Sequence, residues 1–337
     1  MSKMNKITLG QFFTKETSWA QPQIINFIHK CLNEYDVKYC FDPFAGNGDL
    51  INFVKDNFSF LKIYGNDIDP SLNWPVNDSL ISIKKHKKCM IVTNPPYLAK
   101  YSAKRKGGEV YGRVAKYFMN TACEDLYQVA LEKMLNEYDN IVAIIPETFI
   151  NSTFAKDRLN SVTIIEKVPF VDTDCPVCVC CFEKKIHHDS EIKFYKDSKY
   201  ICTYEELLNY RKVPTNILDV KFNSSCGQIA LRAVDNSIGD NDIRFLNINE
   251  LDYDLKNIKT SSRLITVIDV PKVTNVNEFI EICNEILLEY RKQVSDILLS
   301  PFKGNKKNGP RRRRLDYKTA RAIIEEAYTK SIDRKVC

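Results

Sequence analysis

Short apolar runs alternate with amphipathic segments from about residue 37 to residue 185. The apolar runs predict buried strands, at residues 39–42, 61–65, 90–93, 141–145, 162–168 and 177–182. Two helices are predicted between these strands, at 49–57 and 126–137. Strands that alternate with helices are typical of a mostly parallel sheet covered by helices on both faces. The sequence therefore predicts that this part of the chain is an α/β domain.

The pattern changes after Lys185, where charged segments rich in Tyr and Asn show weak periodicity. A short apolar run follows at 264–270, and helices are predicted at 277–299 and 317–329. We place a domain boundary near residue 186. This gives an α/β domain at 1–185 and a smaller α+β domain at 186–337.

Polar residues stand where the first two predicted strands end. The first strand ends at Asp42, and a turn with two glycines follows, formed by Phe44, Ala45, Gly46, Asn47 and Gly48. Glycines let the backbone turn tightly and approach a ligand, and ligands of parallel sheets bind beyond the carboxyl ends of the strands. Asp42 suits a ligand with an ammonium group, and no Lys follows the glycines as it would in a phosphate-binding loop.

Asp67 ends the second strand and suits two ribose hydroxyls, as acids do there in nucleoside-binding folds. Ile68 is placed to cover an adenine face, and Asp78 to reach its amino group. A nucleoside pocket with room for an amino-acid tail indicates S-adenosyl-L-methionine as the cofactor.

The run Asn94-Pro95-Pro96-Tyr97 follows the strand at 90–93 and is a rigid site for a planar amino group. The Asn94 side-chain oxygen and the Pro95 carbonyl are two acceptors, and a proline adds no N–H donor. Two acceptors pull an amino nitrogen toward tetrahedral geometry, so that its lone pair attacks a methyl group in line. Tyr97 offers a ring on which a base can stack. This chemistry needs no covalent enzyme intermediate.

The series of motifs from Gln11 to Tyr97 resembles that of the DNA adenine-N6 methyltransferases of restriction–modification systems. The resemblance is to the group whose recognition domain follows the catalytic domain, and it spans about residues 9–185. It implies a Rossmann-like methyltransferase sheet, and a cofactor site in which Phe13 and Thr14 border the methionine end. It also implies that Phe182 is a second aromatic residue against a flipped-out adenine, and that a restriction endonuclease is a partner.

The charge of the chain is modest, with 49 Lys and Arg against 43 Asp and Glu. The basic residues gather in two segments that suit a polyanion such as double-stranded DNA. The residues predicted to bind it are Lys100, Lys104, Arg105, Lys106, Arg113, Lys303, Lys306, Lys307, Arg311, Arg312, Arg313 and Arg314. We interpret the segment at 98–117 as a mobile loop that becomes ordered on DNA.

No apolar run approaches the ~18 residues of a membrane span, and residues 1–6 lead into no signal peptide. We therefore expect a cytoplasmic monomer or weak dimer with reduced cysteines. Cys175 to His188 carries several Cys and His residues, but their spacing does not match a structural zinc site, so we expect no metal. A nuclease core around Asp172 and Glu183 is also disfavoured.

Three alternatives stay open. An RNA methyltransferase or a protein-glutamine methyltransferase can carry the same four-residue motif, since each methylates a planar nitrogen. N4-cytosine methylation shares the fold, usually with Ser at the position of Asn94. A DNA-binding protein with a vestigial cofactor fold is disfavoured, because Asp42, Asp67 and Asn94 are all present.

Overall fold

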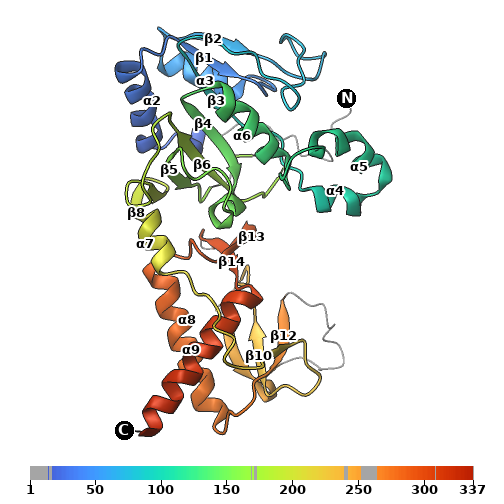
Figure 1. Cartoon of the computed structure of the whole chain (residues 1–337), viewed down its shortest axis with the longest axis vertical. Helices are drawn as coiled ribbons and strands as arrows, with labels where there is room; N and C mark the ends of the chain where they lie inside the picture. The colour runs from blue at the N-terminus through green and yellow to red at the C-terminus, as the bar shows by residue number, and fades with distance from the viewer. Residues whose placement is uncertain are drawn as a thin grey trace. The chain divides into compact units, whose positions relative to one another are not determined.

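The computed structural model describes residues 14, 17–167, 169–170, 173–238, 242–251, 264–307 and 309–336. Its contacts divide the chain into two compact units, Met1–Glu205 and Glu206–Cys337 (Figure 1). No helix in these ranges is long and apolar enough to span a lipid bilayer.

The first unit is built on an eight-stranded sheet in the order β2-β1-β3-β4-β6-β5-β7-β8. The strands are β1 (Tyr39–Asp42), β2 (Lys62–Gly65), β3 (Cys89–Thr93), β4 (Ile141–Pro146), β5 (Leu159–Ile164), β6 (Val177–Phe182), β7 (Lys193–Lys196) and β8 (Lys199–Thr203). β6 and β8 run against the other six strands, so the sheet is mostly parallel, as predicted. The carboxyl ends of β1, β2, β3 and β4 therefore meet at one edge.

Helices lie on both sides of this sheet (Figure 1). The two predicted helices are confirmed as α3 (Asp49–Asn57), which packs on β1 and β2, and α6 (Leu126–Glu137), which packs on β4. The connections β1–α3–β2 and β3–α6–β4 move in opposite directions across the sheet, so right-handed crossovers place α3 and α6 on opposite faces. α2 (Pro22–Glu34) is an additional helix, preceded by η1 (Thr17–Trp19).

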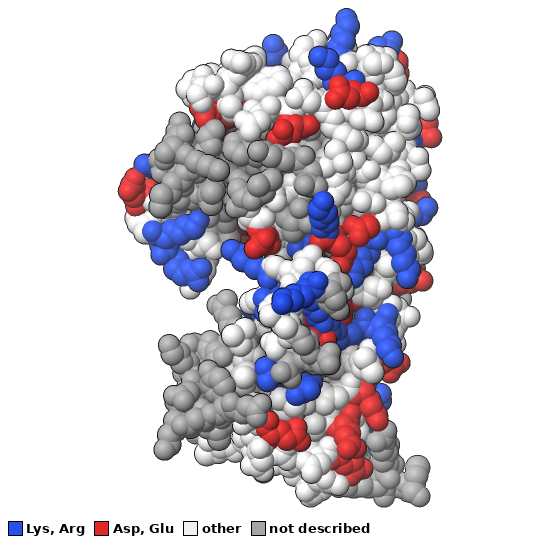
Figure 2. Space-filling view, turned by 180° about the vertical axis from the view of Figure 1, so that it is seen from behind, with Lys and Arg blue, Asp and Glu red and all other residues white. Residues whose placement is uncertain are grey.

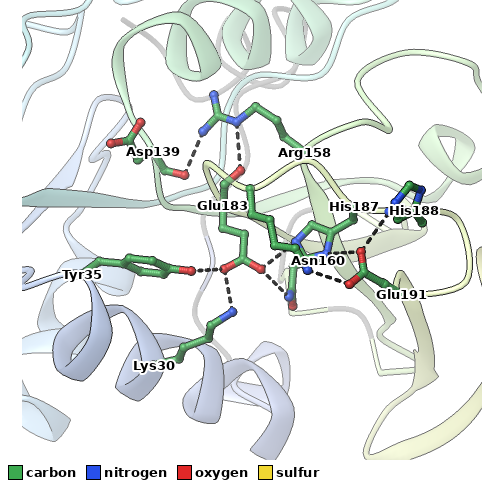
Figure 3. Close-up of polar contacts among 10 residues, drawn as sticks. Lys30, Tyr35, Asp139, Arg158, Asn160, Glu183, His187, His188 and Glu191 are labelled. Carbon is green, nitrogen blue, oxygen red and sulfur yellow. Dashed lines mark hydrogen bonds and ion pairs between the residues drawn. The ribbon is translucent and has the colours of Figure 1, made fainter.

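The fully buried carboxylate of Glu183, next to the end of β6, ties α2 to the sheet (Figure 3). Its Oε2 accepts hydrogen bonds from Lys30 Nζ and Tyr35 Oη of α2 and its C-cap, each at 2.7 Å. Its Oε1 lies 3.0 Å from Asn160 Nδ2 and 2.6 Å from His187 Nε2. Burial works to raise the pKa of this carboxyl, but the bonds from Lys30 and Tyr35 outweigh it and hold the pKa below its ordinary value. Glu183 is therefore an ionised structural group.

The segment after Tyr97 forms helices, so the interpretation of residues 98–117 as a loop is wrong, while its mobility and its ordering on DNA stay predictions. α4 (Lys100–Lys106) and α5 (Gly108–Val114) form a helical hairpin, and η2 (Ala115–Phe118) follows directly. Gly107 turns the corner between the helices with φ 116°, a conformation that L side chains rarely adopt. Lys and Arg are good helix formers, but α4 and α5 bury only Ala103 and Val114 among their side chains. With so few buried apolar positions, the sequence of these two helices lacks the apolar spacing that predicts a helix.

The boundary between the units follows Glu205 rather than residue 185. β7 pairs in parallel with β5, and β8 pairs with β7, so residues 193–203 extend the first sheet. β7 has a single fully buried side chain, Phe194. An edge strand with so few apolar residues resembles a surface segment in the sequence.

The second unit is an α+β domain, as predicted. A four-stranded antiparallel sheet in the order β11-β10-β12-β9 is built from β9 (Lys221–Phe222), β10 (Ile229–Arg232), β11 (Arg244–Asn247) and β12 (Ile265–Asp269). The helices α8 (Val276–Gln293) and α9 (Tyr317–Val336) pack on each other, and α8 also packs on β11. β13 (Ser300–Asn305) and β14 (Arg311–Arg314) form a hairpin, and the remaining short helices are η3 (Glu147–Asn151), α7 (Tyr204–Asn209) and η4 (Ile248–Glu250).

Candidate active site

The glycine turn after β1 lies against Trp74. Gly48, at φ 85°, caps the amino end of α3, and a Cβ added there would lie 3.1 Å from the indole. The Trp74 indole N–H donates to the carbonyl of Gly46 at 3.0 Å. A Cβ on Gly65, at the end of β2, would lie only 2.8 Å from the same ring. Trp74, which the motifs do not single out, therefore fixes the shape of this turn.

Asp42 is buried at the end of β1, with 1% of its surface exposed. Its Oδ1 accepts hydrogen bonds from Thr93 Oγ1 at 2.5 Å and from the Phe44 N–H at 2.9 Å. Burial raises the pKa of Asp42 to about 7, although these two bonds oppose the rise. Among the described residues, both bonds fall on Oδ1. Oδ2 is therefore the oxygen suited to a ligand's positive charge.

Asp67 joins the end of β2 to the glycine turn. Its Oδ2 accepts from the Gly46 N–H at 2.8 Å and its Oδ1 from the Asp69 N–H at 2.9 Å. Ile68, beside it, is 37% exposed. Asp78 follows nearby, because the N–H of Asn77 donates to the carbonyl of Asp67 at 2.9 Å. The three residues predicted to hold a nucleoside thus lie along one stretch of backbone.

A small pocket of about 250 Å³, including the part open to solvent, lies at this edge of the sheet. It is lined by Thr14, Asp42, Phe44, Ala45, Gly46, Asn47, Asp49, Leu50 and Asn94. The structure therefore brings Asn94 to the same pocket as the predicted residues of the methionine end, whereas Gly48, Asp67, Ile68 and Asp78 do not line it. Phe13, which was predicted beside them, lies outside the described residues.

Asn94 follows β3 directly, and contacts on both sides orient its amide. The Nδ2 group donates to Thr14 Oγ1 at 3.1 Å, and the Tyr97 hydroxyl lies against Oδ1. Tyr97 is also anchored to β4, through the carbonyl of Ile144. An amide whose nitrogen faces Thr14 presents its oxygen as the acceptor, which is the orientation that amino-group chemistry requires.

A second aromatic ring lies beside Tyr97, and it is Phe170. The two ring centroids are 6.2 Å apart, in an edge arrangement, and Phe170 forms a β-bridge with Thr14. Phe170 belongs to the connection between β5 and β6, at the edge where β3 and β4 end. An aromatic residue in the connection that follows a predicted strand is the signal that could have identified it.

Phe182 does not lie at this site, so its interpretation as a base-stacking residue is wrong. It pairs with Ile141, the first residue of β4, whereas the last residue, Pro146, pairs with Val177. Because β4 runs parallel to β3, Phe182 lies toward the opposite end of the strands from Asn94. It is fully buried and packs edge-on against Phe149. Phe182 is therefore a core residue.

The α4–α5 hairpin carries its basic residues on the surface. Lys104, Arg105, Lys106 and Arg113 are exposed and Lys100 is half-buried. Lys100 and Lys104 extend over the rings of Phe118 and Tyr111, at 5.8 Å and 5.3 Å. Because α4 begins three residues after Tyr97, the hairpin presents positive charge next to Asn94.

The basic segment of the second unit forms the β-hairpin of β13 and β14. Alternate residues of a strand face opposite sides, and in β14 Arg311 and Arg313 are 2% and 1% exposed. This burial removes them from the predicted DNA-binding residues. Arg312 donates to the carbonyl of Asp235, and Lys306 pairs with Asp242. Lys303 and Lys307 are exposed.

Lys and Arg are otherwise spread over both units with Asp and Glu between them on the face that Figure 2 shows. No face of one sign is visible in that view.

The cysteines of β6 are part of the sheet. Cys178, Cys180 and Cys181 are fully buried, in agreement with their interpretation as strand residues. In the part of the chain that the structure describes, no group of three or more His, Cys, Asp or Glu is arranged to hold a metal ion.

Comparison with known proteins gives a limited result. No protein-family model matches the chain, and no curated protein matches it. Among solved structures, the fold is similar to the crystal structure of the type I restriction enzyme EcoKI M protein. That match has a TM-score of 0.31 at 9% sequence identity and covers 88% of this chain and 66% of that chain.

Proposed function

We propose that the chain is a methyltransferase that transfers a methyl group to the N6 amino group of adenine in double-stranded DNA. The observation that carries this proposal is the position of Asn94. It stands at the end of β3 and lines the same pocket as Asp42, with its amide oriented by Thr14 and Tyr97. An acceptor for an amino group thus adjoins an acid suited to an ammonium group.

S-adenosyl-L-methionine is the proposed cofactor, and when bound it supplies an electrophilic sulfonium methyl group. The residues present fit it. The buried Asp42, whose pKa is raised to about 7 by burial, is stabilised as a carboxylate by an ammonium partner. Phe44 to Gly48 would surround the methionine end, together with Thr14 and, by resemblance, Phe13. Asp67 would hold the ribose, and Ile68 and Asp78 the adenine.

The chemistry of the amino group follows from two acceptors. The Asn94 Oδ1 has two lone pairs, so it can accept from the substrate while the Tyr97 hydroxyl remains beside it. The Pro95 carbonyl is the second proposed acceptor, and Pro96 stiffens the turn. Holding both amino hydrogens localises the nitrogen lone pair toward the methyl donor, and this positioning supplies much of the rate.

An adenine inside a duplex cannot reach such a pocket, so we propose that it is flipped out, which costs a few kcal/mol. Tyr97 and Phe170 would hold its ring. The Lys and Arg side chains of α4 and α5 would bind the neighbouring phosphates, because they are exposed and these helices follow Tyr97 closely in the sequence. The second unit would read the target sequence. A pairing with a restriction endonuclease is proposed from the motif resemblance.

The test is transfer of labelled methyl groups to unmethylated duplex DNA, followed by mass spectrometry of the nucleosides. We expect N6-methyladenine with the wild type and none with Asn94→Ala. Asn136→Ala is the matched control, because Asn136 is an exposed residue of α6. Label in N4-methylcytosine, RNA or protein glutamine instead would overturn the substrate. Label in none of them would overturn the enzyme assignment.

A further inference from the structure

A contact between the basic helical segment and Asp78, which does not line the pocket at Asn94, has no role in the site described above. The Asp78 Oδ2 accepts hydrogen bonds from Lys116 Nζ at 3.0 Å and from the Tyr117 hydroxyl at 2.9 Å. Both donors belong to η2, which continues directly from α5. The contact therefore joins the end of the basic segment to the backbone beside Asp67.

The contact is partly buried at Asp78 and Tyr117, whereas the Lys116 side chain is 53% exposed. The Asp78 side chain is 20% exposed, and Lys116 Nζ also lies 4.7 Å over the ring of Tyr117. Burial and the bond to Asp78 raise the pKa of Tyr117, so its hydroxyl stays a donor at neutral pH. The next residue, Phe118, is buried and anchors η2.

The other end of the basic segment is fixed to the catalytic motif. The N–H of Leu98, directly after Tyr97, donates to Asp125 Oδ1 at 3.0 Å, and the N–H of Lys100 donates to the carbonyl of Glu124 at 2.8 Å. The helical segment 100–118 is therefore attached at one end beside Asn94 and at the other to Asp78.

We infer that Tyr117 and Lys116 are positioning residues that hold Asp78 for the cofactor's adenine and thereby couple cofactor binding to the α4–α5 hairpin. This inference rests on the proposed function. Both donors converge on Oδ2, so Oδ1 is the oxygen that accepts from the 6-amino group. The cofactor and the hairpin are then joined through one carboxylate. A cofactor bound to Asp78 therefore stabilises the position of the hairpin, which carries the basic side chains that would bind the DNA phosphates.

The test compares equilibrium binding of S-adenosylhomocysteine with that of S-inosylhomocysteine, which has a 6-oxo group in place of the amino group. We expect Tyr117→Phe to weaken the binding of S-adenosylhomocysteine about five- to tenfold. Lys116→Met should weaken it about twofold, because an exposed ion pair contributes little. Both variants should bind the inosine analogue as the wild type does. Tyr101→Phe is the control, since Tyr101 lies on α4 and is 71% exposed. A role in folding alone would weaken both ligands equally.

Limited trypsin digestion tests whether cofactor binding stabilises the α4–α5 hairpin, because α4 and α5 carry exposed Lys and Arg. S-adenosylhomocysteine is expected to slow cleavage after Lys104 and Arg105 in the wild type but not in Tyr117→Phe. Variants that bind and digest as the wild type does would overturn the inference while the proposed cofactor stands. A wild type that binds neither ligand would overturn both.

Discussion

The Tyr97 hydroxyl lies 2.7 Å from the carbonyl oxygen of Ile144, in the strand next to the one that Asn94 follows. The same hydroxyl lies against Asn94 Oδ1. One tyrosine thus joins the end of β3 to β4 and orients the amide between them. Tyr97, only 7% exposed as a whole residue, is held by this bond and by the ring of Phe170.

Removing the hydroxyl alone should therefore reduce turnover without removing the ring. For Tyr97→Phe we expect kcat/KM for methyl transfer to fall about tenfold, because the Asn94 amide loses one of the groups that orient it. Tyr97→Ala should cost about a hundredfold or more, since the stacking surface is removed as well. Steady-state kinetics on an unmethylated duplex measures both values. Equal activity of Tyr97→Phe and wild type would show that the hydroxyl does not orient Asn94.

Asp42 predicts a pH dependence of cofactor binding. Burial raises its pKa to about 7 in the free protein, whereas a bound ammonium group keeps it ionised. Below pH 7 the ligand must displace a proton, so affinity should fall about tenfold per pH unit between about pH 7 and pH 5. Calorimetry with S-adenosylhomocysteine measures this slope. Asp42→Asn should bind weakly at every pH, without the slope.

The same shift has a consequence for folding. The folded pKa lies above the ordinary value of 3.8, so the folded protein binds the proton more tightly than the unfolded chain. The contribution of Asp42 to stability is therefore greatest below about pH 4 and is lost as the pH rises through about 7. Asp42→Asn should be more stable than the wild type at pH 8, as thermal unfolding will show. Equal melting temperatures there would argue against a buried carboxylate that burial destabilises.

Phe170 and Phe182 show which part of the site the sequence predicts and which part it does not. The motif at Asn94 and the turn after Asp42 depend on consecutive residues, and the structure places them together at one pocket. A partner ring for Tyr97 depends instead on how β5, β6 and their connection fold back onto the sheet. Each phenylalanine stands beside an apolar run, so the sequence does not show which of them lies at the site. The pairing of Phe182 with Ile141 shows that Phe182 lies away from it.

The fold was predictable where burial is strong, and less so at the surface. Strands such as β4, with every side chain buried, give continuous apolar runs. By contrast, α4 and β7 bury one side chain each, Ala103 and Phe194. The helical hairpin and the true end of the first unit were missed for this reason. Tyr117 was missed because its partner, Asp78, is remote in sequence.

The two phenylalanines also form a matched pair for mutation. Phe170→Ala should lower turnover and reduce the fluorescence gain of 2-aminopurine at the target position, because the flipped base is then held less firmly. Phe182→Ala should instead destabilise the protein by about 3–5 kcal/mol through a cavity in the core. Chemical denaturation and duplex fluorescence separate the two effects. A loss of flipping in a folded Phe182→Ala, with none in Phe170→Ala, would reverse the two roles.

The Glu183 cluster predicts a stability effect remote from catalysis (Figure 3). Glu183→Ala leaves Lys30, Tyr35 and Asn160 without their acceptor, and we expect a loss of about 3 kcal/mol, at the low end for a broken buried pair because Lys30 can rehydrate. Since the pKa of Glu183 is lowered, its contribution is present above the ordinary value of 4.5 and lost as the pH falls. Glu34→Ala, an exposed change on the same helix as Lys30, is the control. Similar unfolding free energies for both variants would show that the cluster does not hold α2.

The exposed Lys and Arg side chains of α4 predict a change in the salt dependence of DNA binding. Replacing Lys104 and Arg105 by Ala should reduce the slope of log affinity against log salt concentration by about 0.9 for each phosphate that is no longer neutralised. The pair Lys38→Ala and Lys62→Ala is the control, because these exposed lysines precede and begin β1 and β2 and so lie at the amino ends of the strands. Fluorescence anisotropy with a labelled duplex, from about 50 to 200 mM salt, measures the slopes. If the control pair lowers the slope and the α4 pair does not, DNA does not approach from the side of the hairpin. The positions of Asn94 and the hairpin would then have to be explained by another substrate.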